Sequence, residues 1–216
     1  MMKTVAFVPI KLHNQRLPGK NLLPLRGVPL CVHVFSTLLK VPEVDEVFAY
    51  CSDDSLKDVL PPGVTFLKRD KDLDGDCVKG GQIYRSFIQN VDADVYVLAH
   101  ATSPFTQPET VEKALGAVLT GDYDSAFSAE RIQTFAWYRG KPINYDLDDV
   151  PRTQDIDPVW IETSGFYIFK KDVFVEKGQR IGSKPFIAEV SGLETVDIDE
   201  SKDYEMACRM IGEYNE

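Results

Sequence analysis

Short apolar runs alternate with stretches of helical periodicity along most of the chain. The apolar runs predict strands over residues 3–9, 46–51, 64–68, 94–100, 124–129, 165–169, 186–190 and 195–199. The helical stretches predict helices over residues 29–40, 78–90, 108–119 and 201–213, and the SDDS run after the second strand supplies an N-cap for a short one. This alternation predicts an α/β fold of three layers, with a mostly parallel sheet and helices on both faces.

The periodicity is lost between residues 130 and 162. This stretch is rich in aromatic side chains, namely Phe135, Trp137, Tyr138, Tyr145 and Trp160. It is either an irregular cap over a site or an arm that packs on a second subunit. We favour the arm, because a lone flap would leave these rings in water. We therefore expect one domain over residues 1–216, with a dimerisation arm at 130–162.

The composition fits a globular protein of 216 residues, 44% of them hydrophobic. No run of 18 apolar residues exists, so no transmembrane span is expected. The first apolar run is short and broken by Pro9 and Lys11, and we interpret it as a strand and not as a signal peptide. Four widely spaced cysteines without a CxxC pair are typical of reduced thiols in a cytoplasmic protein. The histidines lack metal-ligand spacing, so no zinc site is expected.

Charge is distributed unevenly along the chain. The whole chain carries 24 Lys and Arg against 34 Asp and Glu, a net charge of -10, yet residues 1–42 contain six Lys and Arg and no acid. Four of these cations lie between the first strand and the first helix, at Lys11, Arg16, Lys20 and Arg26. A cationic loop on an acidic protein suits a compact polyanion such as a triphosphate, because nucleic acid or a membrane would be repelled. The alternative is a solvated basic loop.

Ligands of open α/β sheets bind at the carboxyl ends of the strands, where this loop begins. The loop lacks both the GxGxxG pattern of dinucleotide sites and the GxxxxGK[ST] pattern of Walker A loops. Gly19, Gly27 and the basic side chains still suit phosphate binding, through charge and through free backbone N–H groups. The HATSPF turn, residues 100–105, follows another strand, and its small residues let a ligand approach the backbone.

Asp197 and Asp199 lie in the predicted strand before the last helix. Alternate residues of a strand share a face, so we expect the two carboxylates to project together. Such a pair is unfavourable unless a cation neutralises it, and oxygen ligands select Mg²⁺. The alternative is that Asp199 or Ser201 only caps the helix. A cationic loop and a carboxylate pair, without a nucleophile–base pair, favour phosphoryl or nucleotidyl transfer.

Four motifs resemble those of the sugar-activating cytidylyltransferases, the enzymes that make CMP-N-acylneuraminate and CMP-Kdo. VPIKLHNQRLPGKNL resembles the family's N-terminal signature, and HATSPF its QPTSPL turn. RTQDIDPVWIETSGFYIF resembles its Arg-Gln…NGAIYI stretch, and VDIDESKDYEMA its terminal DID-helix element. The motifs keep the family's order from Val5 to about Met210. The resemblance implies a Rossmann-like fold of the nucleotide-diphospho-sugar transferase type, and a homodimer in which an arm crosses between subunits.

The resemblance also implies roles for residues on the nucleotide side of the site. Lys20 and Asn21 would contact the phosphates and base region of CTP, while Arg16 neutralises the triphosphate. Lys11 stands where the family usually has Arg, and it supplies charge without the planar fork. Asp197 and Asp199 match the pair that holds Mg²⁺.

Other residues match the sugar side of the family's site. His100, Thr102 and Ser103 belong to the substrate-binding turn, where His100 replaces the family's Gln. Thr163 and Ser164 replace its Asn-Gly. Matching positions near the acceptor sugar, and so candidates for binding its carboxylate and hydroxyls, are Arg152 and Gln154.

We therefore expect a CTP-dependent cytidylyltransferase that transfers CMP to an acidic sugar, a sialic-acid-like nonulosonate or Kdo, with release of pyrophosphate. One alternative is a nucleotidyltransferase for another sugar or a sugar alcohol. Another is a CTP-binding module that has lost turnover, with Lys11, Gln15 and His100 as its off-pattern residues. A structural oligomerisation domain would explain the aromatic arm but not the cationic loop or the DID element.

Overall fold

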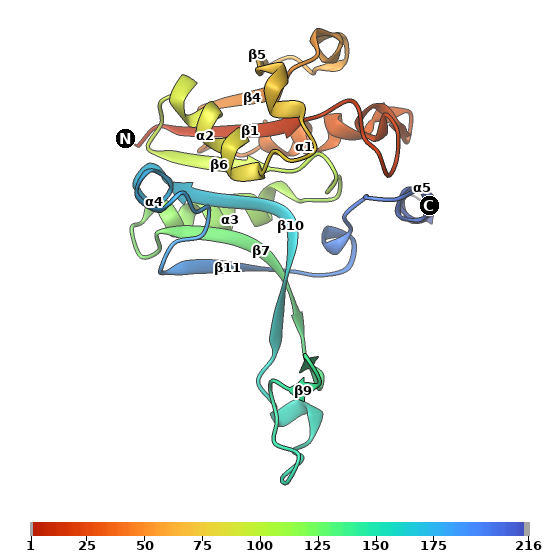
Figure 1. Ribbon diagram of the computed structural model, residues 1–216, viewed down its shortest axis with the longest axis vertical. Helices are drawn as coiled ribbons and strands as arrows, with labels where there is room; N and C mark the ends of the chain where they lie inside the picture. Colours follow the sequence, from red (N-terminus) through yellow and green to blue (C-terminus); the bar gives the residue numbers. More distant parts are fainter. Residues whose placement is uncertain (1, 214–216) are drawn as a thin grey trace.

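A seven-stranded sheet forms the middle layer of residues 2–213, the part of the chain that the computed structural model describes (Figure 1). The strand order is β11-β7-β10-β6-β1-β4-β5. β10 runs antiparallel to both of its neighbours, and the other neighbouring strands are parallel. The strands are β1 Thr4–Ile10, β4 Glu46–Cys51, β5 Val64–Lys68, β6 Val95–Ala99, β7 Ser125–Ile132, β10 Val159–Lys170 and β11 Pro185–Val190. The mostly parallel sheet that the sequence predicted is confirmed.

Helices cover both faces of this sheet, as the alternation predicted. They are α1 Leu30–Leu38, α2 Gly80–Asn90, α3 Pro108–Leu119, α4 Lys171–Lys177 and α5 Ser201–Glu213. α1 and α3 pack against one face, which includes Ala6 and Val8 of β1. α2 and α4 pack against the other face, which includes Val5 and Phe7. Because strand side chains alternate between faces, the continuous apolar run of β1 is what a strand buried on both sides requires. No helix within residues 2–213 is long and apolar enough to cross a membrane.

The C-terminal helix lies at the same end of the sheet as the loop after β1 (Figure 1). A small cluster of buried residues joins the two, and it contains Leu25 and Leu30 from the first part of the chain and Ile198 and Ala207 from the last. The Tyr204 hydroxyl donates to the Pro24 carbonyl oxygen at 2.5 Å. A short hairpin of β2 (Pro24–Leu25) and β3 (Val28–Pro29) leads from the loop into α1. The packing therefore brings the first and last sequence motifs to one edge.

The predicted strand over residues 195–199 is wrong. A 3-10 helix, η5 (Gly192–Thr195), is followed by an irregular segment that belongs to none of the sheets formed within residues 2–213. After β11 the chain leaves the sheet edge and crosses the carboxyl ends of the strands, where the Ile198 N–H donates to the Thr102 carbonyl at 2.8 Å. The alternation of apolar and polar residues at 195–199 cannot distinguish a segment held by this one backbone hydrogen bond from a strand held by a ladder of them.

One helix, α4, was not expected from the sequence. It is short, and Val173 and Val175 are β-branched, so its helix propensity is low. It ends at Gly178, which adopts the left-handed conformation with φ of 66° and closes the helix. Packing of Phe174 against β10 stabilises this helix despite its low propensity.

An arm projects from the body between β7 and β10 (Figure 1). The two strands stay paired beyond the sheet, with Glu162 opposite Ala129 and Val159 opposite Ile132, after a register irregularity between Glu162 and Tyr167. The end of the arm holds the hairpin of β8 (Trp137–Tyr138) and β9 (Lys141–Pro142), and the 3-10 helix η4 (Thr153–Asp155). Its exposed large apolar side chains are Trp137, Tyr138, Ile143, Leu147, Val150, Trp160 and Ile161. The subunit contact through the arm therefore stays a prediction, and the exposed apolar surface is consistent with it.

Candidate active site

The loop after β1 forms one wall of a pocket of about 350 Å³. The loop starts where β1 ends at Ile10, and Gly19 turns it, with φ of 66°, into the 3-10 helix η1 (Lys20–Leu22). The pocket is lined by Lys11, His13, Asn14, Gln15, Arg16, Leu17, Lys20, Asp76 and Asp199. The three cations that sequence reasoning chose, Lys11, Arg16 and Lys20, are thus brought together.

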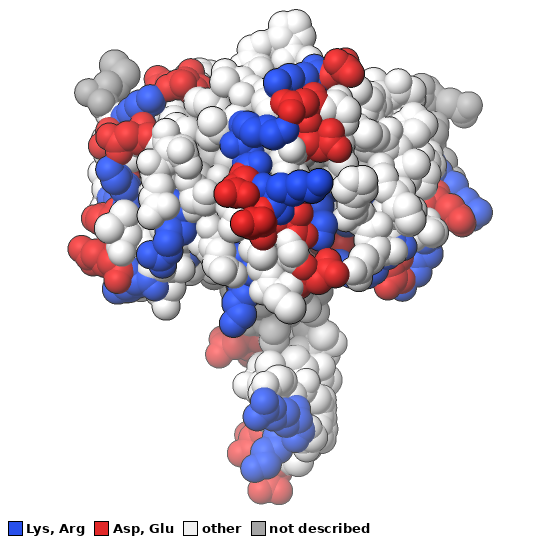
Figure 2. All heavy atoms as spheres, turned by 45° about the horizontal axis from the view of Figure 1, so that its top comes forward, with Lys and Arg blue, Asp and Glu red and all other residues white. Residues whose placement is uncertain are grey.

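Each of these cations has a carboxylate partner in the fold. Lys20 Nζ lies 2.8 Å from Asp199 Oδ1 and donates to the Ile198 carbonyl at 2.9 Å. Arg16 lies 2.8 Å from Asp199 Oδ2. Lys11 lies 3.2 Å from Asp76 Oδ1. The loop that is free of acids in sequence is therefore not an isolated positive patch, and Figure 2 shows acidic side chains beside basic ones on the face it displays.

Asp76 is a pocket residue that sequence reasoning missed. It accepts a hydrogen bond from Gln15 at 2.8 Å in addition to its contact with Lys11. It lies in the acid-rich connection between β5 and α2, where one aspartate cannot be told from its solvated neighbours. Only the tertiary fold places this connection against the cationic loop.

Asp197 and Asp199 differ in their electrostatic surroundings. Burial opposes ionisation of Asp199, but the hydrogen bond and charge of Lys20 and the charge of Arg16 hold its pKa below the ordinary value. Burial raises the pKa of Asp197, although a hydrogen bond from the Thr102 side chain works against this. Asp197 Oδ1 is buried and finds no hydrogen-bond partner among residues 2–213. A buried carboxylate oxygen without a partner, beside a second carboxylate, fits the ligand preference of a small hard cation.

The HATSPF turn lies against this carboxylate segment. The Thr102 carbonyl accepts the Ile198 N–H, so the two motifs are hydrogen-bonded to each other. His100 Nδ1 lies 2.6 Å from the Ser164 carbonyl oxygen, which fixes the neutral ring with its proton on Nδ1. Burial lowers the pKa of His100 to about 4, and the charges of Arg180 and Lys20 add to this effect. Ser103 is buried in the turn, and its Oγ has no hydrogen-bond partner among residues 2–213.

Asn21 is buried behind the cationic loop and not in its wall. Its Nδ2 donates to the Lys11 carbonyl at 2.9 Å, which ties the start of the loop to η1. Its Oδ1 has no hydrogen-bond partner within the described part of the chain. The residue holds the loop, and a contact with the base region of CTP remains a prediction.

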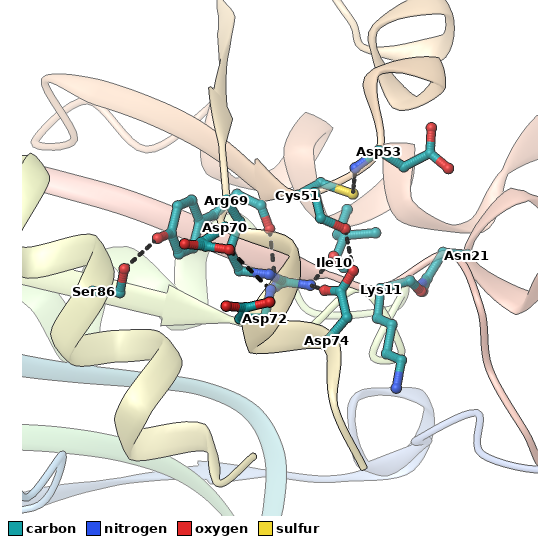
Figure 3. Close-up of polar contacts among 12 residues, drawn as sticks. Ile10, Lys11, Asn21, Cys51, Asp53, Arg69, Asp70, Asp72, Asp74 and Ser86 are labelled. Carbon is teal, nitrogen blue, oxygen red and sulfur yellow. Dashed lines mark hydrogen bonds and ion pairs between the residues drawn. The ribbon is translucent and has the colours of Figure 1, made fainter. Parts of the chain in front are cut away.

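Arg69 holds the strand ends beneath the pocket, and sequence reasoning missed it too. Its side chain is only 2% exposed, and it donates to the carbonyl oxygens of Ile10 at 2.9 Å and Tyr50 at 3.3 Å (Figure 3). It also pairs with Asp74 at 2.6 Å. Because the Ile10 carbonyl ends β1, Arg69 fixes the point from which the cationic loop departs. In the sequence LKRDKD nothing distinguishes this buried arginine from a solvated one.

Arg152 and Gln154 are not brought to the pocket of their own subunit. Both lie on the arm, at the 3-10 helix η4, and Arg152 is largely exposed. Its Nε donates to Asp155 three residues along the chain at 2.7 Å. Within the described chain, neither residue is among those that line the pocket.

The chain is similar to known proteins over most of its length. The family model described as cytidylyltransferase matches residues 5–205. The N-acylneuraminate cytidylyltransferase of Oncorhynchus mykiss is 28% identical over 208 residues, which are 92% of this chain and 48% of that protein. The 3-deoxy-manno-octulosonate cytidylyltransferase of Escherichia coli is 24% identical over 204 residues, 88% of this chain and 81% of that protein. The chain thus spans about half the length of the N-acylneuraminate relatives it matches.

A solved structure shares the fold. It is a CMP:2-keto-3-deoxy-manno-octonic acid synthetase complexed with CTP, with a TM-score of 0.74, 20% sequence identity, and coverage of 98% of this chain and 99% of that one. With a family match that runs from β1 into α5, the chain belongs to the cytidylyltransferase family.

Proposed function

We propose that this chain transfers CMP from CTP to an acidic sugar and releases pyrophosphate. The observation that carries the proposal is the pocket that brings Lys11, Arg16 and Lys20 together with Asp199. Beside it lies Asp197, whose buried Oδ1 has no hydrogen-bond partner among residues 2–213. The relatives are named N-acylneuraminate and 3-deoxy-manno-octulosonate cytidylyltransferases. These names support cytosine as the base of the nucleotide and an acidic sugar as the acceptor.

The three cations would bind the triphosphate. Lys11, Arg16 and Lys20 are held by single carboxylates, and the several charges of a triphosphate compete effectively with Asp76 and Asp199. The anomeric hydroxyl of the sugar would then attack the α-phosphorus, and its proton would pass to solvent water. A phosphorus–oxygen bond forms to the sugar as the bond to pyrophosphate breaks. The cations offset negative charge that grows on the leaving group, and such positioning and neutralisation provide most of the catalysis in reactions of this type.

Asp197 and Asp199 would hold Mg²⁺ together with phosphate oxygens of the nucleotide. Asp197 Oδ1, which lacks a hydrogen-bond partner in the described part of the chain, supports this part of the proposal. When bound, the ion would supply further neutralisation of the triphosphate. Asp199 would then share its two cationic partners, Lys20 and Arg16, with the phosphates.

The arm would join two copies of the chain in a homodimer. Its exposed aromatic and aliphatic side chains support this, because a surface of this kind is stable when a partner covers it. In such a dimer Arg152 and Gln154 of one subunit would reach the acceptor site of the other. We also propose a cytoplasmic location. The four cysteines are free thiols, which is consistent with it.

Pyrophosphate release tests the proposed activity. The chain is incubated with CTP and Mg²⁺ and with N-acetylneuraminate, related nonulosonates, Kdo or neutral sugars, and ATP, GTP and UTP replace CTP in controls. Release with CTP and an acidic sugar is the expected result. Release with only a neutral sugar or a sugar alcohol would assign another acceptor, whereas CTP binding without any release would indicate a binding module without turnover.

A further inference from the structure

A second and larger pocket lies on the face of the sheet covered by α2 and α4. Its volume is about 590 Å³, within the range of small-molecule sites. It is lined by Gly80, Gly81, Tyr84, Phe174, Gly178, Gln179, Arg180 and Ile181. None of these residues belongs to the cationic loop or to the carboxylate segment, so the proposed CTP site does not account for the pocket.

Arg180 is the charged residue that lines this pocket. Its guanidinium carbon lies 3.6 Å from the centre of the Tyr167 ring, so the group is stacked and its orientation is fixed. Nη1 donates to the Tyr84 hydroxyl at 3.3 Å. The carboxylate oxygen of Glu162 lies 3.8 Å from Nη2, which is too long for a hydrogen bond. A guanidinium has five N–H donors, so this one is oriented but keeps most of them for another acceptor.

Glu162 does not neutralise Arg180 fully, because the same carboxylate oxygen is engaged elsewhere. Glu162 Oε2 accepts a hydrogen bond from the Tyr167 hydroxyl at 2.7 Å. That bond holds the carboxylate beyond hydrogen-bond distance of the arginine. The arrangement leaves a preorganised cation at the pocket wall, and planar two-pronged recognition of a carboxylate is what an arginine of this kind provides.

The pocket adjoins the proposed site for CMP transfer through Tyr167. The His100 ring lies 6.0 Å from the Tyr167 ring, on which Arg180 stacks. His100 begins the turn whose Thr102 carbonyl is bonded to Ile198, next to Asp197 and Asp199. Contacts through Tyr167 and His100 therefore link Arg180 to the carboxylate segment.

The walls of the pocket suit a sugar acid and not a second phosphate group. Tyr84, Phe174 and Ile181 give it apolar surfaces on which the carbon skeleton of a sugar can pack. A Cβ at Gly80 would lie 2.7 Å from the Tyr84 hydroxyl, so glycine at this position lets the Tyr84 side chain lie against the start of α2. The pocket's charged donor is one arginine, in contrast to the three cations of the loop.

We infer that Arg180 binds the carboxylate of the acceptor sugar in the pocket between α2 and the connection from α4 to β11. This inference rests on the proposed function, which it deepens by assigning a specificity-determining residue that no motif contains. The hydroxyls of the acceptor are then left to Arg152 and Gln154 of the proposed partner subunit.

Direct binding and turnover together test the inference. Binding of N-acetylneuraminate, Kdo and their uncharged methyl esters to the full chain is measured by calorimetry, and pyrophosphate release gives KM for sugar and for CTP. Arg180→Gln should weaken binding of the acid and raise its KM by about 10- to 100-fold, with KM for CTP unchanged, because a charge-assisted pair is lost. Arg180→Lys should recover part of the loss, since it restores charge without the fork. The methyl esters should bind the wild type and Arg180→Gln equally weakly.

Two further variants make the test specific. Arg85→Gln removes the same charge from α2; Arg85 lies over the Phe174 ring and close to Gly178 but outside the pocket lining, so binding of the acid and its KM should stay unchanged. Glu162→Gln removes the neighbouring negative charge and should strengthen binding of the acid. If Arg180→Gln behaves like Arg85→Gln while the wild type is active, the inference is overturned and the proposed function stands. If the acid binds through Arg180 but no pyrophosphate is released, the inference stands and the proposed activity falls.

Discussion

Lys20 connects two parts of the site that lie 179 positions apart in the chain. Its side chain is 10% exposed, and its ammonium group bridges the Ile198 carbonyl and Asp199. Because the group is both buried and charged, it can stabilise a growing phosphate charge at little reorganisation cost. Lys20→Met should therefore lower kcat for pyrophosphate release by roughly 100- to 1,000-fold.

The same bridge makes a stability control necessary for Lys20. Thermal unfolding of Lys20→Met separates a lost catalytic charge from a loosened C-terminal segment. Lys40→Met is the matched control, because Lys40 is an exposed lysine of the same acid-free stretch. Near-normal turnover of a folded Lys20→Met protein would show that the loop is not the phosphate site.

His100 predicts a pH dependence of stability. Burial lowers its pKa from 6.5 to about 4, so the unfolded chain takes up a proton at a higher pH than the folded chain does. The contribution of His100 to the free energy of unfolding should thus be complete above pH 6.5 and should decrease as the pH falls toward about 4. Between about pH 7.5 and 5.5 the loss from this group should be about 1.4 kcal/mol.

Urea unfolding at these two pH values measures the effect. His100→Gln keeps a side-chain donor for the Ser164 carbonyl. Between the two pH values its free energy of unfolding should decrease by about 1.4 kcal/mol less than that of the wild type. His13→Gln, a change at an exposed histidine, should behave as the wild type does. Equal pH dependence of the wild type and His100→Gln would mean that His100 titrates normally in the fold.

At the scale of elements, the ends of β1 and β4 depend on Arg69. The side chain ties the Ile10 and Tyr50 carbonyls together, and its backbone N–H bonds the Cys51 carbonyl at 2.8 Å. Arg69→Met leaves Asp74 in a partly buried place without its cation, so the free energy of unfolding should fall by about 3–5 kcal/mol. Chemical denaturation checks this, with exposed Lys71→Met from the same connection as the control. A loss below 1 kcal/mol, a bound set by the value of surface ion pairs, would contradict the role given to Arg69.

The elements also show why part of the site could be predicted and part could not. β1, the cationic loop and the HATSPF turn are contiguous, and their apolar run, charge and small residues are visible in the sequence. Asp76, Arg69 and Arg180 gain their roles from contacts that span many residues, and each stands in a charged or polar stretch that looks solvated. The segment at 195–199 was assigned as a strand because hydrophobic alternation reports which side chains are buried, not which backbone groups are bonded.

At the scale of the whole molecule, the arm separates two groups of residues that the proposed reaction needs together. Lys20 lies at the carboxyl end of the sheet, whereas Arg152 and Gln154 lie on the projecting arm (Figure 1). If arms are exchanged in a homodimer, each site takes its loop from one subunit and its arm from the other. A heterodimer with Lys20→Met in one subunit and Arg152→Ala with Gln154→Ala in the other then contains one complete site and one site that carries both defects.

This geometry gives a quantitative expectation for the heterodimer. The two mutant homodimers should have little activity. The heterodimer can be purified through a different tag on each subunit. It should recover about half of the wild-type pyrophosphate release, because one of its two symmetry-related sites is intact. Sedimentation confirms that the species assayed is a dimer. A heterodimer as inactive as its parents would place Arg152 and Gln154 outside the partner's site. Full activity of the Arg152→Ala, Gln154→Ala homodimer would remove both residues from acceptor binding and leave the arm with assembly alone.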